Sequence, residues 1–187
     1  VSLPAQEISV GEDHPLRRLQ WFSLGIGAAG VALSAVLGAA EGRQFFFSYL
    51  VAYLFFLTLG LGGLIFVLLQ FVTRAGWSVT IRRQAEHLMG TLPFMLVLFL
   101  PLLFGLHDLY VWMEAEHVAQ DPLLQSKAPY LNSTFFLIRS FVYLVSWAWM
   151  GYWFRKKSLE QDETGSSRIT RTLQNASAPA IVWFALT

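Results

Sequence analysis

The chain has 187 residues, of which 55% are hydrophobic and only 13% are Asp, Glu, Lys or Arg, about half the roughly 25% that is usual in soluble proteins. The net charge is only +1, but long uncharged stretches alternate with segments in which the charges gather, which is typical of a multi-spanning membrane protein. The absence of Cys excludes structural disulfides, Cys-ligated iron–sulfur clusters and covalently attached c-type haem on this chain.

The first part of the chain predicts a tail and two membrane-spanning helices. Residues 1–15 are polar, contain two prolines and show no apolar periodicity, so we expect a cytoplasmic tail. Arg17 and Arg18 precede an apolar run at about residues 19–40, and a second run covers about residues 45–72. Both runs are long enough to span, because about 20 helical residues at 1.5 Å each cross a hydrocarbon core of ~30 Å.

The third predicted span is a bent helix. It begins as an amphipathic segment that ends at His87, and residues 88–106 are apolar. Pro93 and Pro101 lie inside this stretch, and each removes a backbone donor and crowds the carbonyl group four residues earlier. Neighbouring helices can satisfy the freed carbonyl groups, so a membrane bundle tolerates the bends.

The remaining sequence predicts an outer loop, a fourth span and the start of a fifth helix. Residues 107–129 form an acidic loop, and the fourth span covers about residues 130–154. A polar connection at about residues 158–175 leads to an apolar run at residues 176–187. This last run is too short to cross a bilayer, so we expect the chain to be part of a longer protein.

The basic residues predict the orientation. If the N-terminus is cytoplasmic, ten of the thirteen Lys and Arg residues lie on the cytoplasmic side, whereas Arg43 and Lys127 lie outside and Arg139 lies within the fourth span. We therefore expect an all-α integral membrane fold. Residues 16–157 would form a four-helix transmembrane bundle, and residues 158–187 would form a cytoplasmic connection and the start of a fifth transmembrane helix.

Arg139 is the one basic residue that we expect at membrane depth. It lies eight or nine residues into the fourth span, about 10–13 Å deep at the helical rise. An ionised group there is costly and usually faces protein or water, which would suit a charge that sets the pKa of a nearby acid on a proton route. Alternatively, the side chain snorkels toward the outer interface. The sequence leaves both interpretations open.

Titratable residues also lie at both ends of the third span. Glu86 and His87 are at its cytoplasmic mouth, whereas His107 and Asp108 close its outer end. Such groups could take up protons, or the helix start could be solvated, with Glu86 paired to Arg82 within the helix. The four His residues offer no facing pair at membrane depth, so no bis-His haem site is predicted. Nucleic-acid binding is not expected, because topology explains the basic residues.

Several short stretches resemble one family. They are Ser48-Tyr49-Leu50-Val51-Ala52-Tyr53-Leu54-Phe55-Phe56 with Gly60; Ile81-Arg82-Arg83 followed by Leu92-Pro93 and Leu98-Phe99-Leu100-Pro101-Leu102; Leu109-Tyr110-x-Trp112; Lys127-x-x-Tyr130-Leu131-Asn132 leading to Phe135-Phe136 and Arg139; and Ser177-Ala178-Pro179 ending in Ala185-Leu186-Thr187. The chain resembles the polysulfide-reductase-like (NrfD-type) membrane subunits of bacterial alternative complex III, a quinol:cytochrome c (or other acceptor) oxidoreductase. It is more similar to the second, smaller of the two such subunits.

The resemblance implies a non-catalytic, multi-pass subunit of the bacterial inner membrane that holds redox subunits and contributes to proton translocation. It implies no cofactor on this chain, haem and iron–sulfur clusters on partners, and menaquinone or its quinol nearby. The implied partners are lipids, a sister quinol-binding membrane subunit, an iron–sulfur subunit, and multihaem and monohaem cytochromes c. The implied proton-path candidates are Glu86, His87, Asp108, Lys127 and Arg139. A quinone-binding subunit with its own site, or a free-standing assembly or transport protein, are the alternatives.

Overall fold

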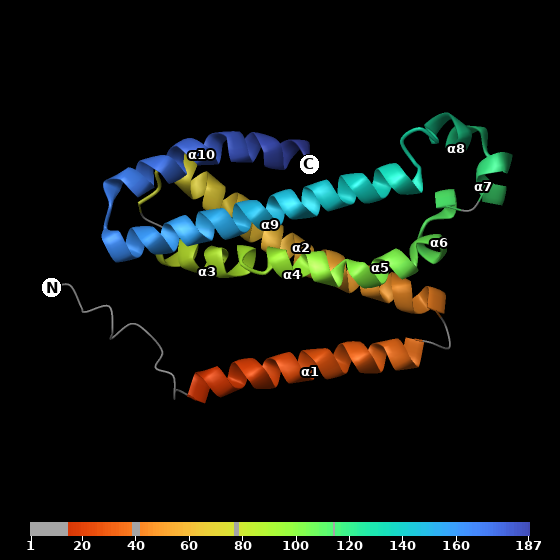
Figure 1. Ribbon diagram of the computed structural model, residues 1–187, viewed down its shortest axis with the longest axis horizontal. Coiled ribbons are helices and arrows are strands. Elements are labelled where there is room, and N and C mark those ends of the chain that lie inside the picture. The colour runs from red at the N-terminus through yellow and green to blue at the C-terminus, as the bar shows by residue number, and fades with distance from the viewer. Residues whose placement is uncertain (1–14, 39–41, 77–78, 114) are drawn as a thin grey trace. The chain divides into compact units, whose positions relative to one another are not determined.

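A computed structural model describes residues 15–38, 42–76, 79–113 and 115–187, and every regular element within these ranges is a helix. In chain order (Figure 1) the elements are α1 (Pro15–Gly38), α2 (Gly42–Val72), α3 (Val79–Met89), α4 (Leu92–Leu98), α5 (Leu100–Phe104), α6 (Leu106–Leu109), η2 (Val111–Met113), α7 (Ala115–Gln120), α8 (Pro122–Lys127), α9 (Ser133–Thr164) and α10 (Ser167–Leu186). The chain divides into two compact units, the first ending at Phe45 and the second covering Phe46–Thr187. The expected tail lies outside the described residues, except for Pro15 at the start of α1.

Within the described ranges, four helical segments are long and apolar enough to cross a membrane, which confirms the predicted fold class. They cover Arg18–Val36, Gly42–Val72, Ile81–Phe104 and Ser133–Thr164. The first of them belongs to α1 in the first unit, and the other three build the second unit together with α10. The chain is therefore an all-α, multi-pass membrane protein in which a fifth helix follows four candidate spans.

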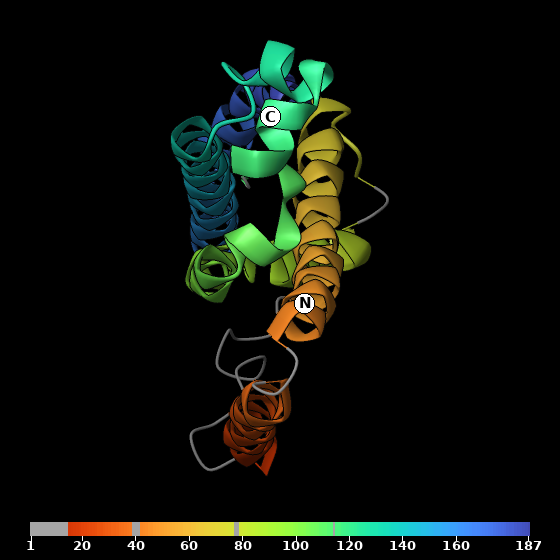
Figure 2. The same cartoon turned by 90° about the vertical axis from the view of Figure 1, so that its right-hand side faces the viewer.

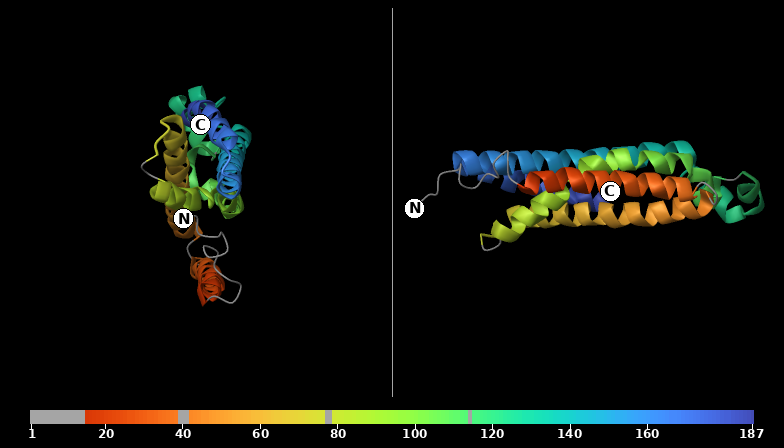
Figure 3. Two further views of the ribbon diagram at one scale, coloured as in Figure 1. Left: turned by 90° about the vertical axis from the view of Figure 1, so that its left-hand side faces the viewer. Right: turned by 90° about the horizontal axis from the view of Figure 1, so that it is seen from below.

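The helices of the second unit run along a common direction. α9 packs beside α4 and α10. Seen from below, α2 also runs lengthwise (Figure 3), but the view down the long axis shows that it is inclined (Figure 2). We call the end where α2 and α9 finish and α3 and α10 begin the basic end. The opposite end, which carries α6, η2, α7 and α8, is called the loop end.

Two glycines allow α2 and α9 to pack closely against the third span. A Cβ atom added to Gly63 of α2 would lie 2.7 Å from the carbonyl oxygen of Ala85 and 2.9 Å from the amide nitrogen of Met89. A Cβ atom on Gly151 of α9 would lie 3.0 Å from the carbonyl oxygen of Met89. Small residues at such positions let helix backbones approach, and the resulting van der Waals contact is one of the forces that drive helix association within lipid.

The third span is broken more sharply than a single bent helix. Its helices α3, α4 and α5 are separated at Gly90–Thr91 and at Phe99, and Pro93 and Pro101 each lie near the start of the next helix. At the first break the amide of Thr91 bonds to the carbonyl of Leu88, three residues back instead of four. Pro93 has no amide hydrogen to offer the carbonyl of Met89, which explains why the helix restarts there.

The expected polar connection at residues 158–175 is largely helical, so the fourth span's helix ends later and the fifth helix begins earlier than predicted. α9 continues to Thr164, the amide of Gly165 bonds to the carbonyl of Gln161, and α10 begins at Ser167. Gly165 has a φ of 62°, a left-handed conformation that favours glycine and ends the helix. Residues 155–164 contain no Gly or Pro and are rich in Lys, Glu and Gln, which are good helix formers. Their polarity therefore does not mark the end of the helix.

The expected outer loop at residues 107–129 contains short helices. The first that lies entirely within it is the single 3₁₀ turn η2 at Val111–Met113. At the start of α8 the side chain of Asp121 accepts a hydrogen bond of 2.8 Å from the amide of Leu123. This contact is the usual way in which an Asp satisfies a free amide in the first turn of a helix.

Candidate functional site

Glu86 is buried at the basic end, where only 2% of the residue is exposed. It lies on α3 one turn after Arg82 and Arg83, so all three side chains fall on one face of the helix. One carboxylate oxygen is 3.4 Å from Arg82 Nε, and the other is 2.5 Å from Arg83 Nη1. The intrahelical pairing with Arg82 that the sequence suggested is present, but the carboxylate is not solvated.

α9 completes this cluster from the opposite side. The hydroxyl of Ser158, which is fully buried, donates a 2.7 Å hydrogen bond to Glu86. Arg83 donates to Ser158 at 3.3 Å and also pairs with Asp162, whose side chain is half exposed. Arg82, Arg83, Glu86, Ser158 and Asp162 thus form one ion cluster that joins α3 to α9. The cluster connects the half-exposed carboxylate of Asp162 to the buried carboxylate of Glu86.

Ser158 and Asp162 were not predicted as site residues, because both were expected in a connection between helices. The available signal was their spacing of four residues on a segment without Gly or Pro, which puts them on one face of a continued helix. The side chain of Arg82 also packs on an aromatic ring, because its guanidinium carbon lies 4.9 Å from the ring centroid of Phe71. Its buried Nε atom has no hydrogen-bond partner within the described part of the chain.

The other proton-path candidates do not join the cluster. His87 is exposed, although it is adjacent to Glu86 in the sequence. Asp108 on α6 and Lys127 on α8 are exposed at the loop end. Arg139 is 19 residues from Ser158 along α9, which corresponds to roughly 28 Å. The five candidates therefore do not form a single site.

Arg139 points back toward the loop end of α9. Its guanidinium carbon is 4.2 Å from the ring centroid of Tyr130 and 5.3 Å from that of Phe135. One nitrogen, Nη1, is buried and has no hydrogen-bond partner among the described residues. Both rings precede Arg139 in the chain, so the side chain lies in the direction that the snorkelling interpretation requires. Its attraction to the two ring faces compensates part of the cost of its depth.

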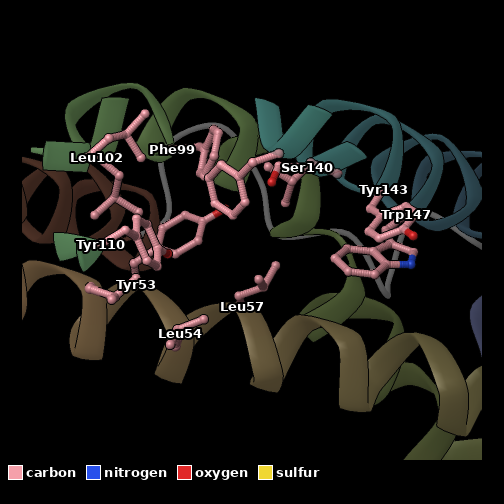
Figure 4. A pocket seen from close by; sticks show the side chains of 13 residues that line it. Tyr53, Leu54, Leu57, Phe99, Leu102, Tyr110, Ser140, Tyr143 and Trp147 are labelled. Carbon is pink, nitrogen blue, oxygen red and sulfur yellow. The ribbon is translucent and has the colours of Figure 1, made fainter. Parts of the chain in front are cut away.

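An apolar cavity of about 170 Å³ lies nearer the loop end, between α2, α5, α6 and α9 (Figure 4). Its wall is formed by Leu50, Tyr53, Leu54, Leu57, Phe99, Leu102, Leu106, Tyr110, Phe136, Ser140, Tyr143, Leu144 and Trp147. The hydroxyl of Tyr53 donates a 3.3 Å hydrogen bond to the carbonyl of Met95. Burial raises the pKa of Tyr110 above its ordinary value of 10.0, so this phenol stays neutral at physiological pH.

The described residues contain no group of three or more His, Asp or Glu side chains that could hold a metal ion. No protein-family model matches the sequence, and no curated protein matches it at a significant level. The features that bear on function are therefore the ion cluster, the cavity and the sequence stretches quoted above.

Proposed function

We propose that the chain is a non-catalytic membrane subunit of a bacterial quinol-oxidising electron-transport complex and contributes to proton translocation. The resemblance of its quoted stretches to the polysulfide-reductase-like subunits of alternative complex III supports this assignment. The partners would be a sister quinol-binding membrane subunit, an iron–sulfur subunit, and multihaem and monohaem cytochromes c. Haem and iron–sulfur clusters would belong to those partners. The chain would lie in the inner membrane with its N-terminus in the cytoplasm, as the distribution of its basic residues indicates.

The observation that carries the proton role is the buried carboxylate of Glu86. A carboxylate shielded from water is expensive to maintain and marks function more often than an exposed one. Here it is connected through Arg83 to Asp162, which is half exposed at the basic end. In the proposed orientation this end faces the cytoplasm, so Asp162 would collect protons and Glu86 would receive them.

The route beyond Glu86 needs hydroxyl groups or water, because residues 88–105 contain no ionisable side chain. The apolar cavity offers hydroxyls from Tyr53, Ser140 and Tyr143 on two different helices. A buried water needs two to four polar partners, so these groups would be its anchors. The route would leave the bundle at the loop end, where Asp108 and Lys127 are exposed.

The test is the number of protons translocated per electron by the intact complex. Glu86→Gln removes the titratable carboxyl but preserves its size, and we expect the ratio to fall while quinol oxidation continues. Glu160→Gln is the matched control, because Glu160 lies at the same end of α9 and its side chain is 42% exposed. The number of protons per electron does not depend on how much folded complex each variant yields, so a loss of stability alone would not lower it. An unchanged ratio in Glu86→Gln would refute the proton role.

The apolar cavity favours a second candidate function, a quinone-binding subunit with its own site. Aromatic walls with a few hydroxyls are suited to a flat ring that carries two carbonyl oxygens. The volume of about 170 Å³ is below the usual range of about 300–1,000 Å³ for ligand sites, which makes this candidate the weaker one. A photoreactive quinone applied to the intact complex would distinguish the two functions. Labelling of the sister subunit alone would exclude this site.

A further inference from the structure

A second apolar space, the tryptophan groove, lies between α9 and α10 and has a volume of about 430 Å³. It is lined by Ser146, Trp149, Met150, Trp153, Phe154, Ala176, Pro179, Ala180 and Trp183. Trp149 is 62% exposed, Trp183 is 42% exposed, and the rings of Trp149 and Trp153 stack with their centroids 6.4 Å apart. The volume falls within the range of about 300–1,000 Å³ that is usual for small-molecule sites.

The groove lies at membrane depth near the basic end. Its α9 wall belongs to the candidate span Ser133–Thr164, whose 32 residues correspond to about 48 Å of helix. This length exceeds a hydrocarbon core of ~30 Å, so part of α9 projects from the membrane. The basic triplet at residues 155–157 directly follows the groove wall. Trp153 therefore sits near the level at which tryptophan is enriched, at the boundary between lipid tails and head groups.

Cations follow the groove wall along the sequence of α9 and precede it along the sequence of α10. Lys157 follows Trp153 by four residues and falls on the same face of α9. Lys156 is exposed, and its Nζ is 6.0 Å from the ring centroid of Tyr152. Arg168 is exposed about two turns before the α10 wall begins. The carboxylate of Glu160 pairs with Lys157 at 2.7 Å, but such a half-exposed pair is weak and can be exchanged for another anion.

We propose that the tryptophan groove binds an acyl chain of an anionic phospholipid from the leaflet at the basic end, with the phosphate held by Lys156, Lys157 and Arg168. An apolar groove whose two helices both carry cations toward the basic end complements a molecule with an apolar tail and an anionic head. A zwitterionic lipid would gain less from these cations. Basic pockets between transmembrane helices are known to bind anionic head groups in this way. The site is distinct from the ion cluster and does not depend on the proposed electron-transport role.

The experiment uses the full chain in phosphatidylcholine vesicles that contain a small share of phosphatidylglycerol with a photoreactive diazirine in its acyl chain. After illumination, peptide mass spectrometry locates the labelled residues. We expect labelling of the groove to exceed that of the outward face of α2, where Val51 and Phe55 are 68% and 59% exposed, by several-fold. Unlabelled phosphatidylglycerol should compete more strongly than added phosphatidylcholine.

The double variant Lys156→Gln/Lys157→Gln tests the head-group contacts. Each cation near an anionic head group accounts for about a five-fold difference in binding, so groove labelling should fall by five-fold or more while labelling of α2 is unchanged. Lys127→Gln, an exposed cation at the loop end, is the matched control and should have no effect. Equal labelling of the groove and α2, equal competition by both lipids, or full labelling of the double variant would overturn the proposal. An unlabelled groove beside a labelled α2 would also overturn it, because polypeptide would then occupy the groove.

Discussion

Replacing Glu86 with Gln should destabilise the helix bundle much more than a comparable change at the surface. Glu86 has 3% of its side chain exposed, and it is the partner of both Arg82 and Arg83. The amide of Gln can still accept the hydrogen bond from Ser158, so the main loss is the negative charge. Removing one partner of a buried ion pair costs about 3–5 kcal/mol, because the other charge remains buried without compensation.

The structure places the expected cost at the lower end of this range. Arg83 is 27% exposed and keeps Asp162 as a partner, so most of its charge stays compensated. Arg82 is only 13% exposed and loses its carboxylate, although the ring of Phe71 stays beneath its guanidinium. We therefore expect a loss of about 3 kcal/mol, which corresponds to a change of roughly 150-fold in the folding equilibrium.

The assay is reversible unfolding of the purified chain in mixed micelles, followed by circular dichroism as the share of denaturing detergent rises. Glu160→Gln is the control, because both side chains of its pair with Lys157 are partly exposed, at 32% and 42%, and the pair should contribute at most about 1 kcal/mol. If Glu86→Gln were no more destabilising than Glu160→Gln, the ion cluster would not hold α3 to α9 as described.

Three other changes test separate parts of the structure. Gly63→Ala should cost about 1–3 kcal/mol because its Cβ would collide with backbone atoms of the third span, whereas Gly62→Ala, whose Cβ meets nothing within 4 Å, should be neutral or stabilising in the same unfolding assay. Arg139→Leu should cost about 1–2 kcal/mol through its lost ring contacts, and a double-mutant cycle with Tyr130→Leu should show that the two costs are not additive. The raised pKa of Tyr110 means that the unfolded chain loses this proton first, so stability should fall as the pH rises above 10. Tyr110→Phe should reduce this loss, as measured by thermal midpoints at about pH 9 and about pH 11.

The positions of the spans could be predicted because hydrophobic length is decided locally. The bends of the third span also followed from Pro93 and Pro101, since a missing amide hydrogen affects the nearest carbonyl group whatever the fold. The end of α9 could not be located in the same way. A change from apolar to polar residues near Arg155 marks where a helix can leave lipid, whereas Gly165 marks where it stops.

The candidate site was only partly predictable for a related reason. The spacing of Arg82 and Glu86 predicts their pairing within one helix, which the structure contains. The burial of Glu86 depends on Ser158 and α9, more than 70 residues later in the chain, and no local pattern encodes that contact. The direction of the Arg139 side chain likewise depends on Tyr130, which lies before the helix begins.

The most direct test of the proposed function is purification of the native membrane complex through an affinity tag on this chain. We predict that the chain co-migrates with c-type haem and iron–sulfur absorbance, and that the purified material oxidises a quinol and reduces a cytochrome c or another acceptor. Glu160→Gln should leave this activity unchanged, because Glu160 lies outside the ion cluster. A chain that purifies without haem and without quinol oxidation would contradict the proposed function and favour a free-standing assembly or transport protein.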